Sequence, residues 1–62
     1  MMVRPYFRLA SGEWIAKEVC SLEECFPSEP EMVLEARASI YSLGVYFGGG
    51  GAAPEWKLEA VG

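Results

Sequence analysis

The segment from Ser28 to Gly44 carries the signals for both ends of a helix. Ser28 precedes Glu29-Pro30-Glu31, so the serine can cap the first turn, the proline is tolerated there, and Glu31 takes the third helical position. Gly44 stands where a left-handed residue commonly ends a helix. Between the two ends, apolar residues recur at helical spacing: Val33, Ala36, Ile40 and Leu43. The sequence therefore predicts a helix over residues 29–43.

Residues 3–19 predict a β-hairpin. Residues 3–9 alternate between the two faces of a strand, residues 14–19 suit a returning strand, and Ser11-Gly12 between them is a turn signal. A two-residue loop would pair Leu9 with Trp14, Phe7 with Ala16, and Arg8 with Ile15. One face would then form a side of the core: Phe7, Leu9, Trp14 and Ala16. The other face would carry Arg4, Tyr6, Arg8 and Lys17, with Ile15 and Val19.

The rest of the chain completes a single small domain, 1–62. Residues 20–27 form a connector, in which Ser21-Leu22-Glu23-Glu24 resembles a second capping box and predicts one helical turn. Residues 45–47 and 55–61 predict short strands, and the glycines at 48–51 between them predict a flexible loop. We expect the α+β class: a β-hairpin, one α-helix and then one or two strands, with the helix packed on a three- or four-stranded antiparallel sheet. The expected core is Phe7, Leu9, Trp14, Val33, Ala36, Ile40, Leu43, Trp56 and Leu58.

Negative charge is concentrated in one stretch. From Glu18 to Glu35 the chain has six glutamates and no basic residue, within a net charge of −4. Helix dipoles explain the acids in first turns, but Glu31 and Glu35 form a like-charge pair at i, i+4 spacing, which is unfavourable. Such a field repels phosphate backbones and attracts basic protein surfaces. The predicted partner-binding glutamates are Glu23, Glu24, Glu31 and Glu35.

The composition excludes most catalytic chemistry. The chain has no His, Asp, Asn, Gln or Thr, so histidine-based general bases and mixed zinc sites are absent. Cys20 and Cys25 supply half a zinc site, and a dimer would be needed to complete it. We expect both cysteines to be reduced and packed, because a disulfide requires the connector to fold back. The protein is predicted to be non-enzymatic, without cofactor or metal.

Tyr6 and Arg8 are further candidate binding residues on the outer face of the hairpin. Arginine and tyrosine are enriched at protein-binding hot spots, and basic strands with aromatic residues also bind single-stranded nucleic acid. The acidic balance disfavours the nucleic-acid alternative, which would use Arg4, Tyr6, Arg8 and Lys17. With 62 residues and 52% apolar composition, a homo-oligomer that completes the core remains an alternative.

In size, acidity and aromatic content the chain resembles the small inhibitors encoded by phages and mobile elements, anti-CRISPR proteins among them. The resemblance implies a protein-binding module that occupies a basic surface of a nucleic-acid-handling partner. The first residues show no apolar run behind their charge, and no stretch has the pattern of a membrane span, so we expect a cytoplasmic location and no membrane association.

Overall fold

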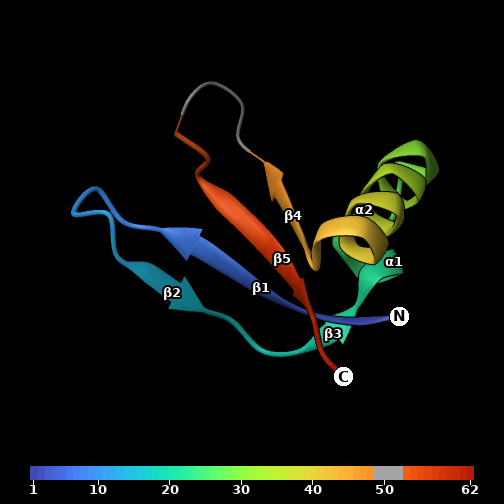
Figure 1. Ribbon diagram of the computed structural model, residues 1–62, viewed down its shortest axis with the longest axis horizontal. Helices are drawn as coiled ribbons and strands as arrows, with labels where there is room; N and C mark the ends of the chain where they lie inside the picture. The colour runs from blue at the N-terminus through green and yellow to red at the C-terminus, as the bar shows by residue number, and fades with distance from the viewer. Residues whose placement is uncertain (49–52) are drawn as a thin grey trace.

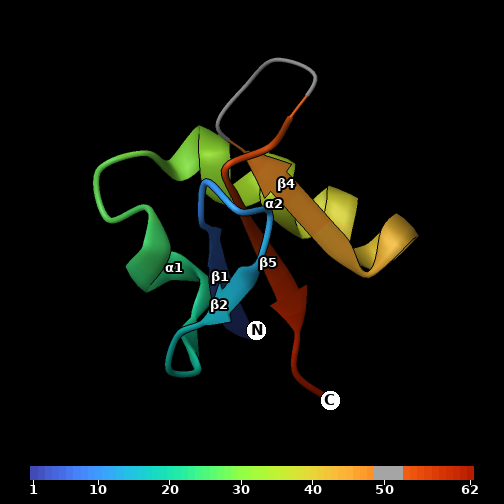
Figure 2. The ribbon, with the colours of Figure 1, turned by 90° about the vertical axis from the view of Figure 1, so that its left-hand side faces the viewer.

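The computed structural model describes residues 1–48 and 53–62, which form two helices packed on an antiparallel sheet (Figure 1). The elements are β1 (Met2–Arg8), β2 (Trp14–Ala16), β3 (Cys20–Ser21), α1 (Leu22–Cys25), α2 (Pro30–Leu43), β4 (Val45–Gly48) and β5 (Trp56–Ala60). The strand order is β2-β1-β5-β4, and β3 also pairs with β1. Seen from the side, α1 and α2 cover only part of the sheet (Figure 2).

The α+β prediction is confirmed, with five strands instead of three or four. The predicted glycine loop falls mostly on residues 49–52, outside the described part.

Helix α2 is the element that the sequence predicts best. It begins at Pro30 and ends at Leu43, and the C-cap residue Gly44 has a left-handed φ of 79° and donates its amide hydrogen to the Ile40 carbonyl at 2.8 Å. The predicted cap is wrong: the N-cap residue is Glu29, not Ser28, and it makes no side-chain cap hydrogen bond. In α1 the one predicted turn is confirmed, but Ser21 also makes no side-chain cap hydrogen bond.

The predicted hairpin register is wrong by one residue. Arg8 is opposite Trp14, Phe7 is opposite Ile15, and Tyr6 is opposite Ala16. The reason is a longer loop: the Leu9 amide donates to the Glu13 carbonyl, and the Gly12 amide donates to the Leu9 carbonyl, each at 2.8 Å. Gly12 has a φ of 93°, the left-handed conformation that a three-residue hairpin loop requires. Because side chains alternate along a strand, this shift moves Trp14 to the opposite face of the sheet.

The predicted second strand, 14–19, is too long: β2 ends at Ala16, and pairing with β1 resumes only at β3, in the segment predicted as a connector, after a β-bulge. The Lys17 amide donates to the Pro5 carbonyl at 2.8 Å, whereas the next pair along is Val3 with Cys20. Two residues, 18 and 19, therefore oppose Arg4 alone, which is the arrangement of a bulge. The Arg4 guanidinium donates to the Lys17 carbonyl at 3.0 Å, so an arginine side chain satisfies a backbone acceptor at the bulge.

The core lies between α2, α1 and one face of the sheet. Its buried members are Val3, Leu22, Val33, Ala36, Ile40 and Leu58. Four of the expected core residues are thus confirmed, and Trp56 packs half-buried against them. Phe7 and Leu9 are 39% and 40% exposed, because they lie near the turn between β1 and β2, which extends away from both helices (Figure 1). Leu43 is 73% exposed. It is the C-terminal residue of α2, beyond Ile40, which is the last α2 residue in the core.

Candidate functional site

The face of the sheet opposite the core carries a cluster of aromatic and basic side chains. Tyr6 on β1 is opposite Lys57 on β5, and Lys57 is in turn opposite Phe47 on β4. Arg8 on β1 is opposite Trp14 on β2. Directly opposed residues share a face, so four strands bring these five residues together. We call this cluster the outer sheet face: Tyr6, Arg8, Trp14, Phe47 and Lys57.

Cation–π contacts organise the outer sheet face. Lys57 Nζ lies 4.8 Å from the ring centroids of both Tyr6 and Trp14, and Arg8 Cζ lies 5.8 Å from the Trp14 ring. The rings of Trp14 and Phe47 are 6.5 Å apart with an interplanar angle of 48°. These distances are in the range at which a cation or a second ring attracts an aromatic face. The cluster is therefore a connected set of contacts across the sheet.

The two cations of this cluster differ in exposure. Lys57 is only 17% exposed and forms an ion pair with Glu59 at 2.9 Å, so its charge is largely compensated within the protein. Arg8 is exposed at the end of β1. The Phe47 side chain is 50% exposed, although it is apolar. The outer sheet face thus offers a partner an aromatic surface and, at its edge, a guanidinium that forms no ion pair with residues 1–48 or 53–62.

Most of the negative charge lies on the other side of the sheet. Residues 22–44, which contain both helices, hold five glutamates and one arginine, whereas the other four acidic and four basic residues lie elsewhere in the chain. The whole net charge of −4 is therefore carried by the helices and their flanks. We call the predicted glutamates on this side the acidic helix layer: Glu23, Glu24, Glu31 and Glu35.

Two of these glutamates have partners that sequence spacing does not reveal. Glu23 Oε2 accepts a hydrogen bond from Arg37 at 2.7 Å, across the contact between α1 and α2. A hydrogen bond from its own backbone amide, the charge of the N-terminus and Arg37 together hold the pKa of Glu23 below its usual value. Burial raises the pKa of Tyr46, and the adjacent charge of Glu35 raises it further. Glu24 and Glu31 are exposed.

The six predicted partner-binding residues therefore belong to two different surfaces. The four glutamates lie on the helices, and Tyr6 and Arg8 lie on the outer sheet face. Three further residues of the outer sheet face were missed by sequence reasoning: Trp14, Phe47 and Lys57. Trp14 was missed because its placement depends on the loop length. Lys57 could have been found, since alternation in residues 55–61 predicts that it points away from the core.

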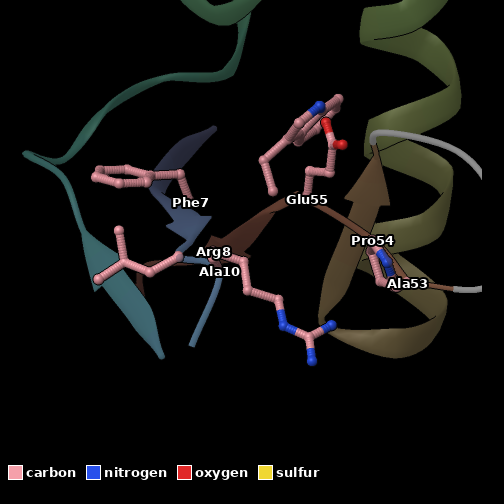
Figure 3. Close-up of a pocket in the computed structure, with 8 residues that line it drawn as sticks. Phe7, Arg8, Ala10, Ala53, Pro54 and Glu55 are labelled. Carbon is pink, nitrogen blue, oxygen red and sulfur yellow. The ribbon is translucent and has the colours of Figure 1, made fainter. Parts of the chain in front are cut away.

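A hollow of about 640 Å³ lies between the end of β1 and the start of β5 (Figure 3). Its lining includes Phe7, Arg8, Glu55 and Trp56, and the Arg8 amide donates to the Glu55 carbonyl at 2.8 Å. Phe7 and Arg8 leave β1 in different directions (Figure 3). Among the described residues that line the hollow, the charged side chains are one arginine and one glutamate, and none of these residues supplies a nucleophile or a pair of carboxylates for acid–base chemistry.

Within residues 1–48 and 53–62, no group of three or more potential ligand side chains is arranged to hold a metal ion. Neither helix in the described part of the chain is long and apolar enough to cross a membrane. Comparisons of the chain with protein-family models, with curated proteins and with solved structures found no match.

Proposed function

We propose that the protein is a non-enzymatic protein-binding module and that the outer sheet face is its main contact surface. The observation that carries the proposal is the group of Tyr6, Trp14 and Phe47 around Lys57 on the sheet face opposite the core. Tryptophan, tyrosine and arginine are the residues most enriched among those that dominate binding energy. Phe47 is exposed and Tyr6 and Trp14 are half-buried, and aromatic side chains that reach the surface of a small protein commonly mark such a surface.

Magnitudes favour the outer sheet face over the acidic helix layer as the source of affinity. A solvent-exposed ion pair contributes about 0–1 kcal/mol, and salt screens it. A buried aromatic or arginine anchor at an interface commonly contributes about 2 kcal/mol or more. Glu23 is already paired with Arg37, which reduces what the acidic helix layer can offer. We therefore assign affinity to the outer sheet face and electrostatic steering to the glutamates.

A second candidate is the small inhibitor expected from the sequence, which would occupy a basic surface of a nucleic-acid-handling partner with the acidic helix layer. The observation that favours it is the concentration of the whole net charge in residues 22–44. Direct binding of nucleic acid is less well supported. The Lys17 side chain lies on the other face of the sheet, with Nζ 5.5 Å from the Phe7 ring, contrary to the prediction. On the outer side, Arg4 is bonded to the Lys17 carbonyl and Lys57 is paired with Glu59, so Arg8 would be the main phosphate contact.

Affinity capture from host lysate with three forms of the tagged protein tests the proposal: wild type, Trp14→Ala and Tyr41→Ala. Tyr41 is a matched control, because it is an aromatic residue on α2 with 77% exposure. A protein retained by wild type and Tyr41→Ala but lost from Trp14→Ala supports the outer sheet face. A protein retained equally by all three, but lost from Glu24→Lys, supports the second candidate instead. Salt-sensitive binding of single-stranded DNA that needs Arg8 would favour the nucleic-acid alternative.

A further inference from the structure

The two cysteines lie side by side in the folded protein. Cys20 Sγ and Cys25 Sγ are 3.5 Å apart, and neither is part of a disulfide. The cause is local: β3 runs into α1 without a loop, so a single helical turn carries Cys25 back toward Ser21. Cys25 Sγ lies 3.7 Å from the Ser21 carbonyl oxygen. The connector therefore folds back in the way that a disulfide between these two cysteines requires.

Little movement separates this pair from a covalent bond. A disulfide has an S–S distance of about 2.05 Å, so the two sulfur atoms need to approach by about 1.5 Å. Both residues are half-buried, and both line an apolar pocket of about 430 Å³ together with Pro5, Phe26, Trp56 and Leu58. Since the pocket is a surface hollow, a small thiol reagent can reach the sulfur atoms through it.

We propose that Cys20 and Cys25 are a redox-active dithiol that forms a reversible intramolecular disulfide in the folded protein. The oxidant is a low-molecular-weight disulfide, such as glutathione disulfide. The Cys20 thiolate attacks one sulfur of the oxidant, forms a mixed disulfide and releases one thiolate. The Cys25 thiolate then attacks Cys20 Sγ and releases the second. Two protein thiols are oxidised, one external disulfide is reduced to two thiols, and the two protein protons go to the departing thiolates.

The surroundings of the sulfur atoms determine the order of the two steps. Burial, the hydrogen bond with Cys20 and the charges of Cys20, Glu24 and Glu23 raise the pKa of Cys25 to about 12. Cys25 therefore holds its proton at neutral pH, and Cys20 is the sulfur that attacks first. Once Cys20 is in a mixed disulfide, its charge and its hydrogen bond no longer oppose ionisation of Cys25. Burial, the largest cause of the raised pKa of Cys25, remains in the mixed disulfide, so only the part due to Cys20 is removed before the second step.

The test is a redox titration of the purified, fully reduced chain in glutathione buffers, under native conditions and in denaturant. Remaining thiols are quenched and alkylated, and the products are identified by mass spectrometry. If the fold brings the sulfur atoms together, the native chain forms the intramolecular bridge at an oxidant level about tenfold or more below that needed in denaturant. The bridge must also reopen with added dithiothreitol. An equal or higher oxidant requirement in the native chain overturns the proposal, and so does a stable glutathione adduct or a disulfide-linked dimer as the main product.

Single substitutions test the order of attack. Cys25→Ser should accumulate a glutathione adduct on Cys20, because no second thiol can displace it. Cys20→Ser should form its adduct on Cys25 several-fold more slowly at neutral pH. Equal rates would contradict the assignment of Cys20 as the attacking residue. The redox titration of the wild-type chain tests the proposal even if neither cysteine variant folds.

Discussion

Arg8 and Trp14 are opposite each other on β1 and β2, and Arg8 Cζ lies 5.8 Å from the Trp14 ring. This relationship depends on the length of the loop between the two strands. A two-residue loop would have placed Ile15 opposite Arg8 and turned Trp14 toward the core. The three-residue loop that Gly12 permits therefore creates the outer sheet face.

Replacing Gly12 with alanine should destabilise the protein. Gly12 has a φ of 93°, a conformation that alanine adopts only with strain. We expect a loss of about 1 kcal/mol in the free energy of unfolding, measured by chemical denaturation. Ser11→Ala in the same loop is the control and should change stability much less. An unchanged stability for Gly12→Ala would show that the loop does not need the left-handed residue.

The sequence predicts the local features of the fold well. Helix α2 is recognisable because its C-terminal glycine and the spacing of Val33, Ala36 and Ile40 are all contained within one segment. The register of the hairpin is not predictable in the same way, because Ser11-Gly12 suits both a two-residue and a three-residue loop. One extra loop residue leaves the local pattern unchanged and yet reverses the face on which Trp14 lies.

The candidate site is harder to predict, because it depends on contacts between distant segments. Arg37 has no acidic residue three or four positions before it, and its partner Glu23 comes from the other helix. The pairing of Lys57 with Tyr6 follows only once β5 is known to lie beside β1. Leu22 is completely buried, although it lies in a segment that sequence reasoning assigns to a connector.

Gly48→Ala should destabilise the edge of the sheet at β4. Gly48 is opposite Trp56, and a Cβ atom added at Gly48 would overlap the indole ring. The ring cannot easily move away, because it packs at 6.0 Å from Phe26 and 5.8 Å from Tyr46. Overpacking of this kind typically costs about 1–3 kcal/mol, which thermal denaturation will detect. A melting temperature equal to that of wild type would mean that Trp56 is free to shift.

Glu35→Lys should leave the protein as stable as wild type or slightly more stable. The change removes the repulsion between Glu31 and Glu35, which is worth about 0.2–0.5 kcal/mol. If the outer sheet face supplies the affinity, the change alters the association rate with a partner and leaves dissociation almost unchanged. Binding kinetics at two salt concentrations measure this, with Glu24→Lys as the matched variant. Faster dissociation in both variants would move the contact surface to the acidic helix layer.

The protein should lose stability in acid, partly through Glu23. The pKa of Glu23 is lower in the folded protein than its usual value, so its contribution is present above that value and is lost as the pH falls through the folded pKa. Stability should therefore decline as the pH falls from about 5 toward 3, and Glu23→Gln should flatten part of this decline. Denaturation of both forms across this range provides the measurement. Identical pH profiles would show that ionisation of Glu23 makes no contribution to the loss of stability in acid.

The most direct test of the proposed contact surface uses the two tryptophans, because they lie on opposite faces of the sheet. Trp14 belongs to the outer sheet face, whereas Trp56 packs against Phe26 and Tyr46 on the core side. In a ¹H–¹⁵N spectrum each indole gives one signal, and Trp14→Phe assigns the pair. When the captured partner is titrated in, the Trp14 indole signal should shift or broaden first, while that of Trp56 changes little. A Trp14 signal that stays unchanged at saturation, with shifts confined to the amides of α1 and α2, would contradict the account.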